Sequence, residues 1–244
     1  FMFSGKTILI TGASGGIGAE LVKALLHENA NIIAVDSNSD SLSKLKEANS
    51  ENSRLRCIVS EIKNEESAHS LLDGVNKLYG LVHLAGIFVP DDMKDGDTEE
   101  VYDPVMQANI RNIYSLYIAA RSALCASEEP SRMVVVSSLA FNRGAPFHTA
   151  YSAAKGALVG MMRSLARKEA PDILINAVAP GFIDTSMPQQ IIQKRGLDTV
   201  MGEIPLKRLG HPSEVSSVIR FLLSSESSYV TGQLINVDGG IICS

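Results

Sequence analysis

The chain has 244 residues, a hydrophobic share of 45%, a charged share of 20% and a formal net charge of −5. This composition is typical of one α/β domain with a sizeable core, and the acidic balance without clustered Lys or Arg argues against a nucleic-acid partner. No apolar run approaches the roughly 20 residues that span a bilayer, and no charged-then-apolar leader opens the chain. We therefore expect a cytoplasmic protein that acts on small molecules and does not associate with a membrane.

Cysteine usage indicates neither a disulfide framework nor a metal site. The three cysteines are Cys57, Cys125 and Cys243, an odd number with no metal-binding spacing. We expect all three to be reduced and structural.

Short β-branched runs alternate with longer amphipathic stretches along the chain. The strands are expected at residues 6–11, 31–36, 55–60, 80–85, 133–137, 173–177 and 233–237. Apolar runs such as 134–136 lack period-two alternation, which is typical of strands covered on both faces. The helices are expected to include 16–28, 65–77, a long one from about 98 to 126, and 149–169. The pattern predicts an α/β class fold over residues 1–244: a single-domain, doubly wound Rossmann fold with a seven-stranded, mostly parallel sheet.

Three segments depart from this alternation. Residues 37–53 are rich in Ser and Asn and residues 91–100 are acidic, so both are expected to be solvated faces or loops. Residues 185–210 carry two prolines and several apolar side chains. Ligands of such a sheet bind beyond the carboxyl ends of its strands, and we expect this last segment to form a substrate lid there.

A glycine-rich turn directly follows the first expected strand and leads into an amphipathic helix. It has the sequence Thr11-Gly12-Ala13-Ser14-Gly15-Gly16-Ile17-Gly18. Glycines let backbone N–H groups approach phosphate oxygens, the helix N-terminus adds unpaired donors, and the Ser14 hydroxyl is a further donor. The turn therefore predicts a diphosphate site. Its glycine spacing is not G-x-G-x-x-G, and a bare glycine turn is equally consistent with a tight turn alone.

Asp36 ends the second expected strand, eighteen residues after Gly18. A dinucleotide fold places an acidic residue here against the adenosine ribose, where the carboxylate accepts hydrogen bonds from both hydroxyls and repels a 2′-phosphate. No basic residue occupies positions 14, 15, 37 or 38 to bind such a phosphate. We therefore predict NAD as the cofactor, with NADP disfavoured. The alternative is that Asp36 only forms a turn.

Tyr151 and Lys155 lie four residues apart on one face of an expected helix. Moving the Tyr pKa from about 10 to neutrality requires about 4 kcal/mol, which a nearby Lys and a bound nicotinamide cation would both supply. The pair then predicts a group that handles the proton accompanying hydride transfer. A motif this short also fits two ordinary surface residues of a helix, so further residues must decide.

The order and spacing of these motifs resemble the short-chain dehydrogenase/reductase superfamily, from about residue 6 to residue 240. Ser138 precedes Tyr151 by thirteen residues, as the family's catalytic Ser does, and Asn109 matches the Asn of the family tetrad. The resemblance implies that Tyr151 is the general acid/base and that Ser138 hydrogen-bonds the substrate oxygen. It also implies that Lys155 lowers the Tyr pKa and holds the ribose, while Asn109 anchors a proton-relay water. Taken singly, Ser138 is better explained as a strand-end hydroxyl that satisfies the backbone and Asn109 as a buried helix amide, but the four matches in register favour catalysis.

The resemblance extends to further segments that would hold a dinucleotide. Residues 180–185 resemble the segment that contacts the nicotinamide carboxamide, chiefly through Ile183 and Thr185. Glu61-Ile62 stand where the family's Asp and an apolar residue meet adenine, and residues 229–232 and 237–240 complete the likeness. The expected cofactor residues are Gly12, Ser14, Gly16, Ile17, Gly18, Asp36, Glu61, Ile62, Ala85, Gly86, Tyr151, Lys155, Pro180, Gly181, Ile183 and Thr185.

One segment departs from the family pattern. After the fourth strand the chain has His83-Leu84-Ala85-Gly86 where the family commonly has Asn-Asn-Ala-Gly. Ala85 and Gly86 still permit a close approach of the cofactor, whereas the lost amides remove a hydrogen bond to the sheet or a ribose contact. We expect His83 to be a satisfied core residue. His148 is a candidate for lining the substrate site beside Ser138 and Tyr151.

Together these features predict an oxidoreductase that transfers a hydride between NAD(H) and a secondary alcohol or ketone. A nearer alternative is an NADPH-dependent reductase of 3-oxoacyl thioesters on acyl carrier protein. An alternative of another class is a non-catalytic dinucleotide sensor. The helices at 98–126 and 149–169 resemble the pair through which family members form dimers and tetramers, so a homo-oligomer is expected.

Charge argues against the acyl carrier protein alternative, in addition to Asp36. The acidic carrier needs a basic docking rim. We expect Glu128-Glu129 and Pro171-Asp172 to flank the crevice, which leaves only Arg132, Arg167 and Lys168 for such a rim.

Overall fold

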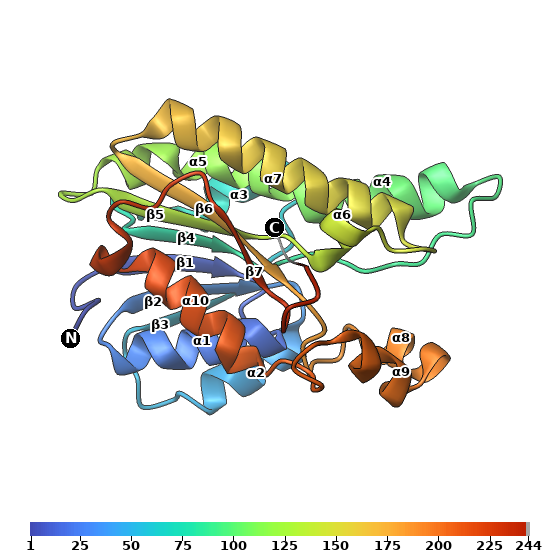
Figure 1. Ribbon diagram of the computed structural model, residues 1–244. Helices are drawn as coiled ribbons and strands as arrows, with labels where there is room; N and C mark the ends of the chain where they lie inside the picture. Colours follow the sequence, from blue (N-terminus) through green and yellow to red (C-terminus); the bar gives the residue numbers. More distant parts are fainter. Residues whose placement is uncertain (243–244) are drawn as a thin grey trace.

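The structure is a computed structural model that describes residues 1–242. Seven parallel strands form one sheet in the order β3-β2-β1-β4-β5-β6-β7, with helices on both faces (Figure 1). This confirms the predicted single-domain, doubly wound fold. The strands are β1 (Thr7–Thr11), β2 (Asn31–Asp36), β3 (Leu55–Val59), β4 (Gly80–His83), β5 (Ser131–Val136), β6 (Ile173–Pro180) and β7 (Leu234–Val237).

Successive strand residues point into two different cores. In β5, Val134 and Val136 pack into the core on one face and Val135 into the core on the other. Figure 1 shows α3, α5 and α7 on one side of the sheet and α1, α2 and α10 on the other. The α-helices are α1 (Gly16–His27), α2 (Ser39–Glu47), α3 (Glu65–Leu71), α4 (Asp103–Met106), α5 (Asn112–Cys125), α6 (Leu139–Arg143), α7 (Thr149–Glu169), α8 (Gln189–Arg195), α9 (Leu197–Glu203) and α10 (Pro212–Leu223).

The expected helix at 98–126 is not a continuous α-helix. Two π-helical turns, η1 (Thr98–Tyr102) and η2 (Gln107–Arg111), flank α4 and lead into α5. A single π-turn inserts a residue into a helix and shifts the face that the following side chains present. Periodicity alone does not reveal such an insertion.

Two further expectations about helices are wrong. The helix expected at 65–77 ends at Leu71, and the chain then takes a left-handed conformation at Gly74, φ 76°. The stretch 37–53, expected to be a loop or solvated face, contains α2. The Asn38 side chain caps α2 by accepting a hydrogen bond from the Ser41 amide, and Leu42 and Leu45 are buried.

The chain reverses its direction of winding at the centre of the sheet. After β1 it enters α1 on one face, and after β4 it enters η1 and α5 on the other. The connections that follow these two neighbouring strands therefore leave toward opposite faces of the sheet, at the place where a doubly wound fold forms its ligand crevice.

The segment expected to be a lid forms α8 and α9 at this edge of the sheet (Figure 1). Phe182, Val200 and Ile204 make a small separate core, and Leu139 of α6 packs against it. Within residues 1–242, no helix is both long and apolar enough to cross a bilayer.

Candidate functional site

The four residues predicted to be catalytic lie together beside the carboxyl ends of β4 and β5. Tyr151 and Lys155 lie on α7, Ser138 is the second residue after β5, and Asn109 lies on η2. Tyr151 and Lys155 are 5% and 4% exposed, and Asn109 is fully buried. The interpretation of Tyr151 and Lys155 as ordinary surface residues is therefore excluded.

Burial controls the ionisation of the Tyr151–Lys155 pair. The Lys155 ammonium lies 5.5 Å from the centre of the Tyr151 ring and donates a 3.0 Å hydrogen bond to the Val136 carbonyl. Burial lowers the pKa of Lys155 to about 8. Burial also raises the pKa of Tyr151 to about 12, although a hydrogen bond with Ser138 lowers it in part. Among the groups of the chain itself, loss of solvation therefore outweighs the effect of Ser138 on the Tyr151 hydroxyl.

Two consecutive serines join the end of β5 to the helices. Ser138 caps α6, since its Oγ accepts a 3.1 Å hydrogen bond from the Ala140 amide. The Ser137 hydroxyl donates a 2.8 Å hydrogen bond to the Lys155 carbonyl and so ties α7 to the sheet. Sequence reasoning did not assign this second role, because a Ser gives no sign of a partner eighteen residues away.

Asn109 is held by its amide nitrogen and leaves its oxygen free. Nδ2 donates to the carbonyls of Ile87 and Val105, at 2.9 and 3.0 Å. Oδ1 is buried and has no hydrogen-bond partner among residues 1–242. A Cβ added at Gly86 would stand 2.3 Å from Asn109 Oδ1 and 3.4 Å from Lys155 Nζ, so the glycine lies directly between these two groups. The free acceptor fits the predicted role of holding a water near Lys155.

The glycine turn lies against the segment that follows β4. Gly12 has φ 66°, and a Cβ on it would stand 2.7 Å from the Ala85 amide nitrogen. A Cβ on Gly18 would stand 2.3 Å from the Gly12 carbonyl. Gly15 precedes α1 and supplies no side-chain cap to its first turn. This helix N-terminus, lined by close backbone, fits the diphosphate of a dinucleotide.

Asp36 lies beside the same turn, and its carboxylate is well oriented. Oδ2 accepts hydrogen bonds from the Ser14 amide at 3.0 Å and the Ser14 hydroxyl at 2.7 Å, while Oδ1 accepts one from the Asn38 amide at 3.1 Å. The Ser14 hydroxyl therefore donates to Asp36 and not toward the diphosphate position where we expected it. A carboxylate fixed at the end of β2 fits the ribose of the same dinucleotide.

We call the glycine turn, Asp36 and the facing residues 84–86 the cradle. Of the remaining expected cofactor residues, some contact the cradle and others do not. A Cβ on Gly16 would stand 2.6 Å from Thr185 Cγ2, so residues 180–185 meet the glycine turn. Ile183 is buried and pairs with Gly210 at the base of the segment that carries α8 and α9. Ile62 is buried in the core, whereas Glu61 is exposed and pairs with Lys63.

His83 is only half satisfied, contrary to expectation. The ring is fully buried, and Nδ1 shares a 2.8 Å hydrogen bond with Thr11 Oγ1. Nε2 is buried and has no partner among the described residues.

An aromatic group that the sequence did not indicate lies beside Tyr151. The Phe88 ring stacks on the His148 ring with centroids 3.8 Å apart and meets the Tyr151 ring edge-on at 4.8 Å. Burial lowers the pKa of His148. Met187 Sδ lies 4.0 Å from the Tyr151 hydroxyl, so α7 and the start of the expected lid approach each other there. Phe88 lies five residues after β4, and its spacing gave no sign of this stacking.

The acidic stretches expected to flank the crevice do not do so within one chain. Residues 128–129 precede β5 and residues 171–172 precede β6, so they lie at the amino ends of these strands, opposite Tyr151. Arg132 is buried, and Arg167 and Lys168 are at the far end of α7, about 24 Å from Tyr151 at 1.5 Å per residue. Within one chain these acidic residues therefore do not oppose an acyl carrier protein at the site, and the expectation that they would was wrong.

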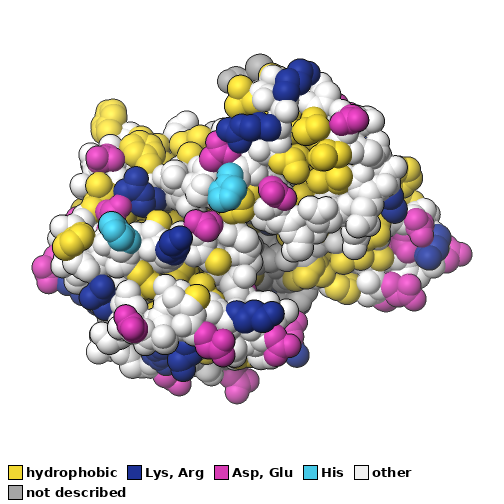
Figure 2. All heavy atoms as spheres, turned by 90° about the horizontal axis from the view of Figure 1, so that it is seen from below, with side chains coloured by type: hydrophobic (Ala, Val, Ile, Leu, Met, Phe, Trp, Pro, Cys, Tyr) yellow, Lys and Arg dark blue, Asp and Glu magenta, His cyan; other side chains and the backbone are white. Residues whose placement is uncertain are grey.

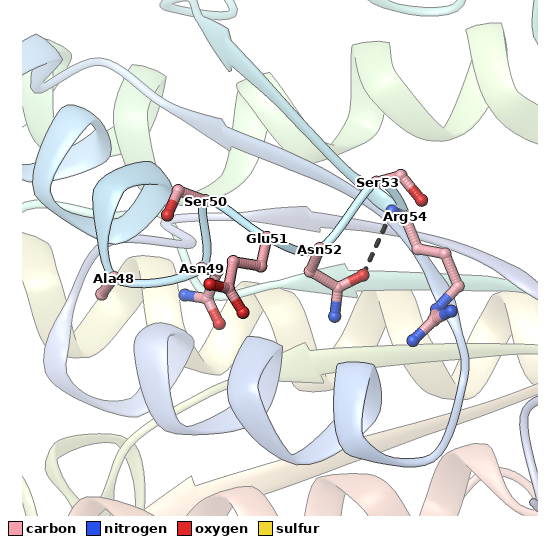
Figure 3. A pocket seen from close by; sticks show the side chains of 7 residues that line it. All are labelled: Ala48, Asn49, Ser50, Glu51, Asn52, Ser53 and Arg54. Carbon is pink, nitrogen blue, oxygen red and sulfur yellow. Dashed lines mark hydrogen bonds between the residues drawn. The ribbon is translucent and has the colours of Figure 1, made fainter.

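Other surface features carry no comparable chemistry. Figure 2 shows acidic and basic side chains interspersed on the face seen from below, with no continuous basic patch on that face. A depression lined by Ala48 to Arg54 is formed by the single loop between α2 and β3, where Asn52 accepts a hydrogen bond from the Arg54 amide (Figure 3). This loop precedes β3 and so lies at the edge of the sheet opposite the cradle. Among residues 1–242, no three potential metal ligands come together.

Comparisons with known proteins agree with this geometry. A family model described as enoyl-(acyl carrier protein) reductase matches residues 12–242. The chain is 36% identical to the 3-oxoacyl-[acyl-carrier-protein] reductase FabG of Thermotoga maritima and 34% identical to that of Rickettsia felis, with 98% of each chain covered in both comparisons.

Solved structures show the same fold. The short-chain dehydrogenase/reductase SDR:Glucose/ribitol dehydrogenase of Brucella melitensis superposes with a TM-score of 0.91 at 34% identity, covering 100% of this chain and 99% of that one. The RhlG/NADP active-site complex of Pseudomonas aeruginosa superposes with a TM-score of 0.89 at 25% identity, covering 98% and 96%. These relatives, together with the family motifs that occur in order along the chain, show that the chain belongs to the short-chain dehydrogenase/reductase superfamily of NAD(P)-dependent oxidoreductases.

Proposed function

We propose that this enzyme transfers a hydride between NAD(H) and a ketone or its secondary alcohol, and that its substrate is the 3-oxo group of an acyl thioester. The observation that carries the proposal is that the buried Tyr151 hydroxyl lies close enough to the Ser138 hydroxyl, beyond the end of β5, for Ser138 to lower its pKa. Two neighbouring hydroxyls provide two donors for one carbonyl oxygen. This is the arrangement that stabilises a developing alkoxide.

The substrate class is supported by the relatives and by the walls of the site. The two relatives cited above are 3-oxoacyl-[acyl-carrier-protein] reductases. The Phe88 ring meets the Tyr151 ring edge-on and the Met187 thioether lies 4.0 Å from the Tyr151 hydroxyl, and both side chains suit an acyl chain. The Brucella neighbour instead favours a sugar or polyol as a second candidate substrate. A polyol needs several polar partners, and these two side chains supply none.

The proposed mechanism assigns one task to each residue. When bound, the nicotinamide supplies or accepts the hydride. In the reduction direction the Ser138 hydroxyl polarises the carbonyl oxygen and the Tyr151 hydroxyl protonates it. Lys155 places a positive charge beside the Tyr151 ring and favours the loss of that proton. Asn109 Oδ1 holds a water from which the proton is replaced.

The cofactor proposal rests on Asp36. Its carboxylate is fixed by Ser14 and Asn38 at the end of β2, where a 2′-phosphate would meet a negative charge. The RhlG complex contains NADP, so the test must compare both cofactors. We expect a higher kcat/KM with NADH than with NADPH, and a preference for NADPH would contradict this assignment.

The experiment that tests the proposed function uses Tyr151→Phe. This variant should lower kcat by about 10²–10⁴-fold, the contribution typical of general acid catalysis, and leave NADH affinity within about twofold. Tyr229→Phe is the matched control, because the Tyr229 side chain is fully exposed and lies outside the proposed site and interface. Assays should compare 3-oxoacyl thioesters, sugar alcohols and simple ketones. Retained activity in Tyr151→Phe would contradict the mechanism, and a preference for sugar alcohols would contradict the substrate class.

Two further expectations remain proposals. We propose that the chain forms a homo-oligomer through α5 and α7, supported by the exposed Tyr114 and Ile118, which lie one turn apart on α5. Light scattering would test this, and a monomer at micromolar concentration would contradict it. A cytoplasmic location also stays a prediction, and cell fractionation would test it.

A further inference from the structure

The strongest unassigned feature is the pair formed by His83 and Thr11. These residues end the neighbouring strands β4 and β1, and they are directly opposite each other in the sheet register. His83 Nδ1 and Thr11 Oγ1 are 2.8 Å apart, and the two residues are 0% and 1% exposed. A hydrogen bond so fully removed from water holds its two strand ends in one relative position.

The segments on either side of this pair form the dinucleotide cradle. Thr11 is followed by Gly12, and His83 is followed by Leu84 and Ala85. A Cβ on Gly12 would meet the Ala85 amide at 2.7 Å and the Leu84 carbonyl carbon at 2.8 Å. The backbones of the two segments are therefore so close that even a Cβ atom on Gly12 would clash. A small shift between the ends of β1 and β4 would change the position of the glycine turn relative to Ala85 and Gly86.

Thr11 also receives a second contact from the same segment. The Ala85 amide donates to Thr11 Oγ1 at 3.4 Å, and the Leu84 amide donates to the Thr11 carbonyl at 3.1 Å. With Oγ1 accepting from Ala85, the arrangement that satisfies the hydroxyl hydrogen has Thr11 donating to His83 Nδ1. The imidazole then acts as a neutral acceptor, with its own proton on Nε2.

The surroundings keep the ring neutral. Burial, and secondly the charge of Lys155, lower the pKa of His83 to about 3. Its neighbour on β5, Val135, packs into the core that includes the buried side chains of α7, and Lys155 of α7 is the charged group that acts on the ring. A neutral acceptor beside Lys155 avoids placing a second cation in the buried site.

We propose that His83 is a positioning residue for the cofactor: through its hydrogen bond to Thr11 it sets the glycine turn against residues 84–86 and so determines dinucleotide affinity. His83, which stands where the family commonly has an Asn, thus takes over the contact to this strand end. The inference rests on the dinucleotide cofactor of the family and does not depend on which ketone is the substrate.

The test measures NADH and NADPH binding by fluorescence titration in six variants. Thr11→Val and His83→Leu each remove one side of the hydrogen bond, and the double variant removes both. Thr11→Ser keeps the hydroxyl, and His83→Asn keeps a neutral acceptor at the same strand position. Thr7→Val, at the opposite end of β1, is the matched control for the loss of a hydroxyl.

We expect Thr11→Val and His83→Leu each to weaken NADH binding about five- to tenfold, the range for one net hydrogen bond. Their kcat at saturating NADH should stay within about twofold, and the double variant should bind no more weakly than the weaker single variant. Thr11→Ser and His83→Asn should bind within about twofold of the wild type.

Several results would overturn the role of His83. They are unchanged NADH affinity in folded Thr11→Val, multiplicative losses in the double variant, or a His83→Asn that binds as poorly as His83→Leu. If His83→Leu does not fold, Thr11→Val and Thr11→Ser still decide the question. Failure of the wild type to bind either dinucleotide would instead contradict the cofactor that the proposed function requires.

Discussion

Replacing the buried Lys155 with Met should have a pH-dependent effect on stability. Lys155 has a pKa of about 8 in the folded chain, against 10.5 for an ordinary Lys. A Lys whose pKa falls on folding binds its proton more tightly in the unfolded chain. Its cost to stability is therefore largest below pH 8 and disappears as the pH rises toward 10.5. Met has nearly the same length and carries no charge, so it removes this cost.

The magnitude follows from the two pKa values. At 1.36 kcal/mol for each pKa unit, the full difference is about 3 kcal/mol, of which about 2.5 kcal/mol lies between pH 7 and pH 10. The unfolding free energy of the wild type minus that of Lys155→Met should therefore rise by about 2 to 3 kcal/mol over this interval. Measuring the difference between the two proteins cancels the titration of groups that they share.

The assay is urea unfolding of both proteins at half-unit pH steps from 7 to 10. Lys23→Met is the control, because Lys23 is exposed on α1 and its difference from wild type should be flat. A flat difference for Lys155→Met as well would refute the reasoning. It would show that water reaches the Lys155 ammonium in the folded chain and keeps its pKa near the ordinary value.

Two other substitutions probe the segment proposed to be a lid, α8 and α9, and the proposed cofactor selector, Asp36. Glu203 on α9 pairs with Arg143 of α6 at 2.7 Å and with Arg195 of α8, and these hydrogen bonds lower its pKa to about 2. Glu203→Gln should speed amide exchange in α8 and α9 about two- to fivefold, since exposed ion pairs contribute about 0.2–1 kcal/mol; exchange equal to the wild type would contradict a role for this ion cluster in holding α8 and α9. Asp36→Ser should raise the ratio of NADPH to NADH efficiency at least about tenfold, with exposed Asp40→Ser as the control, and an unchanged ratio would contradict Asp36 as selector.

Much of the fold followed from local patterns. Strands covered on both faces have continuous apolar runs, and β2 and α7 occur at the expected residues. The errors in helix boundaries arose where the composition or the apolar spacing of a whole segment concealed a local feature of the backbone. Asn38 capped a helix inside a polar stretch, and two π-turns interrupted a helix whose apolar spacing looked regular.

For the predicted site, too, the residue motifs could be recognised in the sequence, whereas the effect of their surroundings could not. The glycine turn, Asp36 and the Tyr151–Lys155 pair are short motifs, and their occurrence in the order of the family, together with Ser138 and Asn109, is what predicts their chemistry. Their electrostatics were not readable from the motif. Burial moves the pKa of Tyr151 upward and that of Lys155 downward, and burial belongs to the surrounding helices and strands.

The amino-acid sequence by itself determined the class of fold and predicted the dinucleotide turn and the reacting pair, because each depends on residues close together in the chain. Only the tertiary structure decided which distant groups meet. It placed Phe88 against His148, joined Thr11 to His83 across two strands, and moved residues 128–129 and 171–172 to the far edge of the sheet. Such contacts follow from how the strands are ordered, and strand order arises from long-range packing that local residue patterns do not encode.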